Sequence, residues 1–274
     1  MLRRCVLVVL FAGTPLVAQQ KPQTPPLPRG EEEVAEITTD RPDVTEAATV
    51  VPAGSLQFEN GMTWSRAAGA SSVDVSQTLV RYGLTERWEL RLEVPDFLGF
   101  LGSPGIESGF SDAAVGAKRQ LGPLPGGFDL AVIAGVSVPT GSGAESSHGA
   151  DPFVKFPWAH ALRKPWSVGG QFSVFYLSEN GRRNMLTEPC FYLEREIGSR
   201  DEIFVEYVGD YHHRGTPGQL LHFGTAYKLT PLHQIDFHAG VGLSRSAPDF
   251  FAAIGYSFRL DGLFGRRRTR DSGH

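Results

Sequence analysis

The stretch Asp249–Leu260, DFFAAIGYSFRL, decides how the rest of the chain is interpreted. Its residues alternate in character: one set is apolar or aromatic throughout, and most of the other set is small or polar. Because successive side chains of a β-strand point to opposite faces, this alternation predicts a strand with one apolar face. Its length of roughly ten residues is also what a tilted strand needs to cross a bilayer.

The segment Trp88–Val94, WELRLEV, shows the same alternation most clearly. Its apolar residues alternate with charged ones: Glu89, Arg91 and Glu93. A soluble β-sandwich could not bury such a charged face in its core, whereas the polar lumen of a membrane barrel accommodates it. This segment therefore favours an outer-membrane β-barrel.

The whole chain fits about twelve such strands. They are expected at residues 56–64, 73–83, 88–94, 112–121, 128–138, 153–162, 166–176, 186–196, 202–210, 221–228, 235–243 and 249–260. The connections alternate between long and short. This is typical of a barrel with long outer loops, short periplasmic turns and both chain termini on the periplasmic side. We predict an all-β fold: a single antiparallel up-and-down barrel, closed so that no strand edge is exposed. The strand at 153–162 is the weakest, because Pro157 cannot donate to a ladder and predicts a bulge or an interruption.

The chain divides into four parts. Residues 1–18 are typical of a signal peptide, with Arg3 and Arg4 before an apolar run and small residues around Ala18. Residues 19–53 form a polar leader, 54–260 the barrel and 261–274 a basic, polar tail. Export would leave Cys190 as the single cysteine, so no internal disulfide is expected. We predict an outer-membrane location, with lipid and the barrel-assembly machinery as partners. A net charge of −4 gives no reason to expect nucleic-acid binding, and we predict no metal or cofactor.

Several segments resemble one family. They are Thr39–Glu46 (TDRPDVTE), Val50–Gly61 (VVPAGSLQFENG), Arg81–Arg91 (RYGLTERWELR), Asp112 with Gly116 and Lys118, and Pro139–Gly141. They are similar to the outer-membrane transporter family named after the MetA pathway of phenol degradation. The resemblance implies an outer-membrane barrel that passes small molecules, aromatic or hydrophobic ones among them. One departure is that Phe258 is followed by the basic run Arg266–Arg270, whereas many barrels end on an aromatic residue.

Passive transport of a small solute is the favoured function. The predicted lumen-facing charges are Arg81, Glu89, Arg91, Glu93, Asp112, Lys118, Glu194, Glu206 and Lys228. The leader could tuck into the lumen as a constriction or plug, where the charged side chains of Asp40, Arg41, Asp43 and Glu46 would meet charges of the wall. The predicted aromatic girdle comprises Tyr82, Trp88, Trp166, Tyr227, Tyr256 and Phe258.

Two alternatives remain open. In the first, the charges satisfy one another and the barrel is a structural protein with a closed lumen. In the second, which is less favoured, the barrel is a lipolytic enzyme with Ser178 as nucleophile. Tyr176 stands where such an enzyme would carry its histidine, so we predict no catalytic residue and no enzymatic activity.

Overall fold

The computed structural model describes residues 35–101, 108–179 and 181–263. The predicted signal peptide, the beginning of the leader and the basic run 266–270 lie outside the described residues. Within the described part, the regular structure is β-strand apart from one short 3-10 helix, Gly143–Glu145. No helix of this part is long and apolar enough to cross a membrane.

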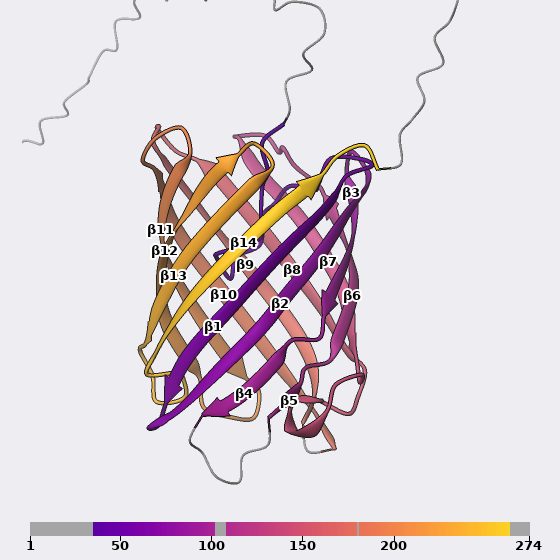
Figure 1. The fold of residues 1–274 in the computed structure, drawn as a ribbon, viewed down its shortest axis with the longest axis vertical. Helices are drawn as coiled ribbons and strands as arrows, with labels where there is room; N and C mark the ends of the chain where they lie inside the picture. Colours follow the sequence, from indigo (N-terminus) through magenta and orange to yellow (C-terminus); the bar gives the residue numbers. More distant parts are fainter. Residues whose placement is uncertain (1–34, 102–107, 180, 264–274) are drawn as a thin grey trace, which may run out of the picture. The chain divides into compact units, whose positions relative to one another are not determined.

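All strands belong to one antiparallel sheet. They are β1 (Leu56–Ala67), β2 (Ala70–Thr85), β3 (Trp88–Val94), β4 (Phe97–Leu101), β5 (Gly109–Phe110), β6 (Ala113–Gln120), β7 (Phe128–Val138), β8 (Asp151–Ala161), β9 (Trp166–Glu179), β10 (Arg182–Glu196), β11 (Asp201–His212), β12 (Gly218–Thr230), β13 (His233–Gly242) and β14 (Phe250–Leu260). β1 pairs with β2 on one side and with β14 on the other, so the sheet closes on itself (Figure 1). β4 continues the pairing of β3 with β2 and β5 pairs with β4, so neither adds a strand to the ring, which leaves twelve strands in the barrel. The predicted fold class is confirmed.

The barrel wall separates apolar from polar side chains strand by strand. On β3, Trp88, Leu90 and Leu92 are exposed, while Glu89 and Arg91 are buried. β14 repeats the pattern, with Ile254 and Tyr256 among its exposed residues. Since the charged residues are the buried ones, the apolar surface belongs outside, against lipid, and the polar surface lines the interior.

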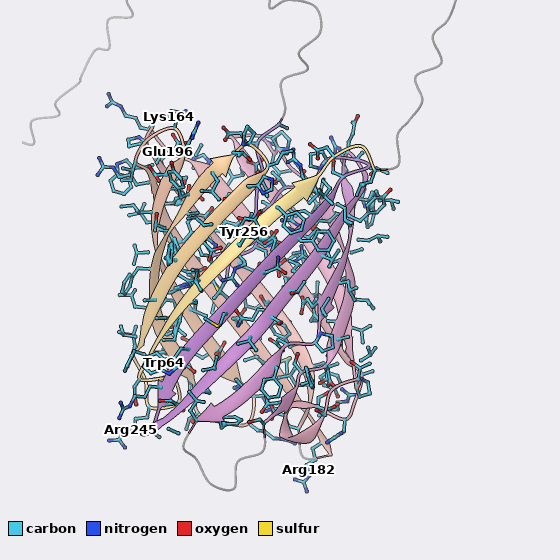
Figure 2. The ribbon with its side chains drawn as sticks, viewed as in Figure 1. Trp64, Lys164, Arg182, Glu196, Arg245 and Tyr256 are labelled. Carbon is cyan, nitrogen blue, oxygen red and sulfur yellow. The ribbon has the colours of Figure 1, made fainter. Side chains whose placement is uncertain are left out.

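At one end of the barrel the strands are joined by turns, whereas the connections at the other end range from a tight hairpin between β1 and β2 to the longer segment between β7 and β8. Lys164 and Glu196 mark the first end in Figure 2, and Arg182 and Arg245 mark the second. The outer loop between β9 and β10 is shorter than predicted, because β9 continues to Glu179 and β10 already begins at Arg182. An Asn-Gly pair at 180–181 is a strong signal for such a two-residue hairpin, and Gly181 has the positive φ of 71° that it requires.

Two irregularities in the wall have local causes. β8 runs unbroken through Pro157, although its ladder to β7 lapses between the pairs Leu130–Trp158 and Ile133–Lys155 and resumes in the same register. A proline lacks the N–H that this ladder would need, so the pairing is lost locally and the strand is kept. In β2, Ser76 has a φ of 63° where the register against β1 shifts, which makes it the extra residue of a β-bulge.

Candidate functional site

The described part of the leader, residues 35–53, lies inside the barrel; we call it the plug segment. Its backbone N–H groups donate to wall side chains: Val44 to Glu206 on β11, Glu46 to Gln171 on β9 and Val51 to Glu89 on β3. These strands lie far apart around the ring, so a segment this short reaches all of them only from within (Figure 1).

The plug segment is held by wall side chains and not by a strand ladder. It contains Pro42 and Pro52, each of which removes a backbone donor, and its sequence lacks a period-two pattern. Buried backbone N–H groups nevertheless need acceptors, and here wall carboxylates and amides supply them. Polar contacts of this kind can be exchanged for contacts with water, which is what a movable plug requires.

Asp40 is the most heavily bonded residue of the plug segment. Its carboxylate accepts from Arg91 at 2.6 Å and from Lys118 at 2.9 Å, and it lies 3.2 Å from the guanidinium of Arg81. It also accepts the backbone N–H of Ala47 at 2.8 Å, which folds the segment back on itself. One carboxylate thus joins the plug to three wall cations.

These contacts belong to a balanced buried ion-pair network. Its four carboxylates and four cations are Asp40, Glu46, Glu59, Glu89, Arg81, Arg91, Lys118 and Lys155. Arg81 is fully buried and bonds to Glu59 at 2.9 Å and bidentately to Glu89. Removing one partner from such a network leaves an uncompensated buried charge, which typically costs about 3–5 kcal/mol.

A second anchor is formed by Arg41. Its guanidinium lies 3.2 Å from the carboxylate of Asp236 on β13, and its Nη2 lies 3.2 Å from His238 on the same strand. Gly61 and Gly255 make room for it, because a Cβ at either position would collide with the guanidinium. The wall is therefore shaped for this side chain.

Two cavities flank the plug segment. One, of about 240 Å³, is lined by residues 37–43 and 45–49 together with Tyr192, Glu194 and Glu202 of the wall. The other, of about 210 Å³, is lined by Glu59, Glu93 and other residues near the loop end of the barrel. Arg41 lines both cavities. Among the described residues no other lines both cavities.

The remaining predicted lumen residues take other positions. Asp112 does not join the network: it precedes β6 and accepts four hydrogen bonds from Gly141, Ser146 and Ser147 of the outer loop. Burial alone would raise the pKa of Asp112, but these hydrogen bonds outweigh it and lower the pKa below its ordinary value.

Three further predicted residues, Asp43, Glu194 and Lys228, line the first cavity. Glu194 accepts from the Ser167 hydroxyl, and Lys228 donates to Glu36. Asp43 lines the first cavity and makes no ion pair with a described residue.

The predicted girdle residues lie on the strands near the short-turn end. Trp88, Trp166, Tyr227 and Tyr256 are exposed on the outer surface, whereas Tyr82 and Phe258 are partly covered. Arg119 stacks over Trp88 and Arg195 over Trp166, each 5.3 Å from the ring centroid. An aromatic ring with a cation beside it suits the lipid–water interface.

Sequence reasoning missed several wall residues that hold the plug segment. They are Glu59, Lys155, Gln171, His222, Asp236 and His238. The alternation of their strands already places most of them on the inward face, and that signal could have found them. Lys155 was obscured because Pro157 made its strand the hardest to read.

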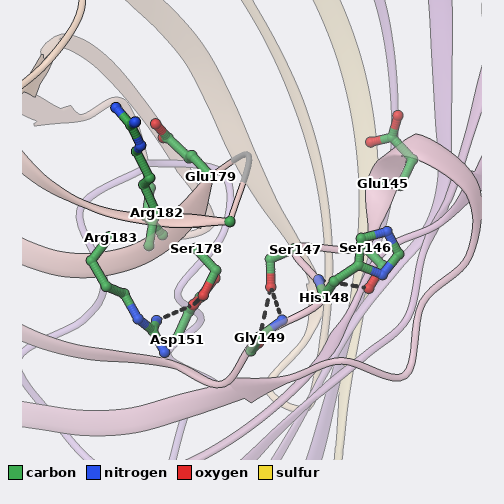
Figure 3. Close-up of a pocket in the computed structure, with 12 residues that line it drawn as sticks. Glu145, Ser146, Ser147, His148, Gly149, Asp151, Ser178, Glu179, Arg182 and Arg183 are labelled. Atoms are coloured by element: carbon green, nitrogen blue, oxygen red, sulfur yellow. Dashed lines mark hydrogen bonds and ion pairs between the residues drawn. The ribbon is translucent and has the colours of Figure 1, made fainter.

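A further pocket of about 850 Å³ opens among the outer loops and contains Ser178 (Figure 3). The Ser178 hydroxyl donates to Asp151 at 2.6 Å, and Arg183 binds the same carboxylate oxygen at 2.7 Å. His148 lines this pocket but forms no hydrogen bond to Ser178 among the described residues. The acceptor of the Ser178 hydroxyl is thus a carboxylate paired with Arg183 and not a histidine, which differs from the Ser–His arrangement of a lipolytic enzyme.

The sequence was compared with models of known protein families. The model of the family described as "Putative MetA-pathway of phenol degradation" matches residues 39–260. The chain belongs to this family. No curated protein sequence matches the chain.

Solved structures show the same fold. The COG4313 outer membrane channel from Pseudomonas putida F1 is 13% identical and superposes with a TM-score of 0.58 over 78% of this chain and 98% of that one. The NanC porin is 11% identical, with a TM-score of 0.52 over 75% and 100% of the two chains. The KdgM porin, also 11% identical, gives 0.50 over 74% and 98%. This member of the phenol-degradation family thus has the fold of outer-membrane channels.

Proposed function

We propose that this chain is exported to the outer membrane and acts there as a passive channel for small solutes, aromatic or hydrophobic molecules among them. In this proposal the plug segment closes the lumen, and solutes pass when it moves. The family membership and the channel fold support this proposal.

The observation that carries the proposal is the pair of cavities on either side of the plug segment. Both reach Arg41, so displacing this one side chain and the backbone around it would join them. A barrel built only as a scaffold has no need for space on both sides of a polar plug. A filled lumen with apolar packing would be the simpler solution.

The fully paired ion network favours a second candidate, a structural barrel with a permanently closed lumen. Comparing the intact protein with a variant that lacks residues 35–52 separates the two, with heat-modifiable migration in gels as the control for a folded barrel. A channel should conduct ions in planar bilayers and admit small aromatic solutes into liposomes with the plug segment in place, and do so more often without it, whereas a structural barrel passes neither in its intact form. If the intact protein passes neither, or if the folded deletion variant passes neither, the channel proposal is wrong.

A further inference from the structure

The anchor at Arg41 continues into a chain of hydrogen bonds across the inner wall. Nη2 of Arg41 lies 3.2 Å from Nε2 of His238, whose Nδ1 lies 2.6 Å from Nε2 of His222. Nδ1 of His222 lies 3.1 Å from a carboxylate oxygen of Glu206. Glu206 also accepts the backbone N–H groups of Val44 and Thr45 in the plug segment. The chain therefore begins and ends on the plug.

The donors and acceptors along this chain fix where its protons lie. A guanidinium can only donate, so Nε2 of His238 accepts and its Nδ1 carries the hydrogen. That hydrogen points at Nε2 of His222, which leaves the hydrogen of the second ring on Nδ1, facing Glu206. The opposite tautomers would set two donors together at Arg41 and two acceptors together at Glu206. With both histidines neutral, one arrangement pairs a donor with an acceptor at every contact of the chain: each ring carries its hydrogen on Nδ1.

One additional proton breaks this arrangement wherever it enters. If His238 gains it, Nε2 becomes a donor that faces the Arg41 guanidinium. If His222 gains it, both nitrogens of this ring donate, and His238 must accept at Nδ1 and carry its hydrogen on Nε2. In both cases an N–H and a positive charge are set against Arg41.

The surroundings of the two rings divide between favouring and opposing that proton. Glu206 on β11 and Asp236 on β13 favour it. Asp43 of the plug segment lies near Glu206, but burial and the neighbouring carboxylates favour its neutral form, so it adds no charge. The burial of both rings and the Arg41 cation oppose the proton. The other neighbours are neutral: the rings of Phe204 and Phe251, and the Gln77 amide, which contacts Arg41.

We infer that the Glu206–His222–His238 chain is a proton-sensitive latch on Arg41, the side chain that lines both cavities. With both rings neutral the latch holds the plug segment closed. When the pair takes up a proton in acid, Arg41 loses its contact with His238 and the plug segment is released more often. Histidine is the side chain whose ordinary pKa places its change of charge between about pH 5 and 8. The opening of the channel, but not the latch itself, rests on the proposed function.

The latch is tested by measuring two quantities separately at pH 7.5 and 4.5: the hydrogen exchange of plug-segment amides and the current through the barrel. In the intact protein, the protection of the Val44 and Thr45 amides against hydrogen exchange should fall in acid, by at most about tenfold per pH unit for a single proton. The bilayer current should rise over the same range. The doubly substituted variant His222→Gln/His238→Gln keeps neutral side chains at both pH values and should lose most of this response.

His233→Gln provides the matched control. His233 lies on the same strand as His238 but contacts the Tyr256 hydroxyl on the exposed surface, so this variant should respond to acid as the parent does. The latch is wrong if protection in the parent is unchanged between the two pH values, or if the double variant responds as strongly as the parent. Protection that falls in acid while the deletion variant carries no current would support the latch and sink the channel.

Discussion

Replacing Asp40 by asparagine tests the ion-pair network most sharply. Asparagine keeps the shape of the side chain but removes the negative charge that Arg81, Arg91 and Lys118 share. The network then holds four cations against three carboxylates. Removing one partner of a buried ion pair costs about 3–5 kcal/mol, so the free energy that favours the docked plug over the released one should fall by this amount. At 1.4 kcal/mol per factor of ten, the ratio of docked to released plug falls roughly 100- to 4,000-fold.

The assay is conductance of the purified protein in planar bilayers, with heat-modifiable migration in gels as the control for a folded barrel. Asp40→Asn should conduct far more often than the parent. Asp43→Asn makes the same chemical change three residues away, at a side chain that lines the first cavity and makes no ion pair with a described residue, so this variant should stay closed. Equal currents from the two variants, with both barrels folded, would refute the role assigned to Asp40.

Three further predictions follow from single positions. Gly61→Ala places a methyl group where the Arg41 guanidinium lies; because that side chain can shift, the barrel should fold and carry more current in the same bilayer assay. The Asp112 carboxyl should titrate below the ordinary aspartate value of about 4, as followed by carbon-13 NMR. Its lowered pKa means that it stabilises the loop at neutral pH and that this contribution is lost as the pH falls through the lowered value; a titration at or above the ordinary value would contradict the assignment. Cys190 is fully buried in the wall, so a polar maleimide should label it only after denaturation, and rapid labelling of the native protein would be inconsistent with the packed lumen.

Much of the barrel could be predicted from the sequence because sidedness is local information. In Trp88–Val94, seven residues suffice to show which side chains face lipid and which face the lumen. The predicted strands therefore correspond to the twelve of the ring. The prediction of the outer loops was less accurate, because β4 continues the pairing of β3 with β2, and β5 pairs with β4, in a Gly- and Phe-rich segment without alternation.

The site could be predicted only in part. The leader motif suggested that Asp40 and Glu46 would meet wall cations, and the structure places them against Arg91 and Lys118. Their exact partners are not written in the sequence, because the contacts join residues 45 to 78 positions apart. The histidine chain depends on register: His222 pairs with Gly240 and His238 with Gly224, so the two rings meet only diagonally across β12 and β13.

Hydrogen exchange of the plug segment in the native, membrane-embedded protein at neutral pH tests the central claim most directly. The amides of Asp40, Val44, Thr45 and Val51 donate to buried carboxylates of the wall. They should therefore exchange orders of magnitude more slowly than an unstructured peptide of the same sequence. Exchange of all four at the rate of an unstructured peptide would show that the leader lies outside the lumen and that the barrel is closed, if at all, by something else.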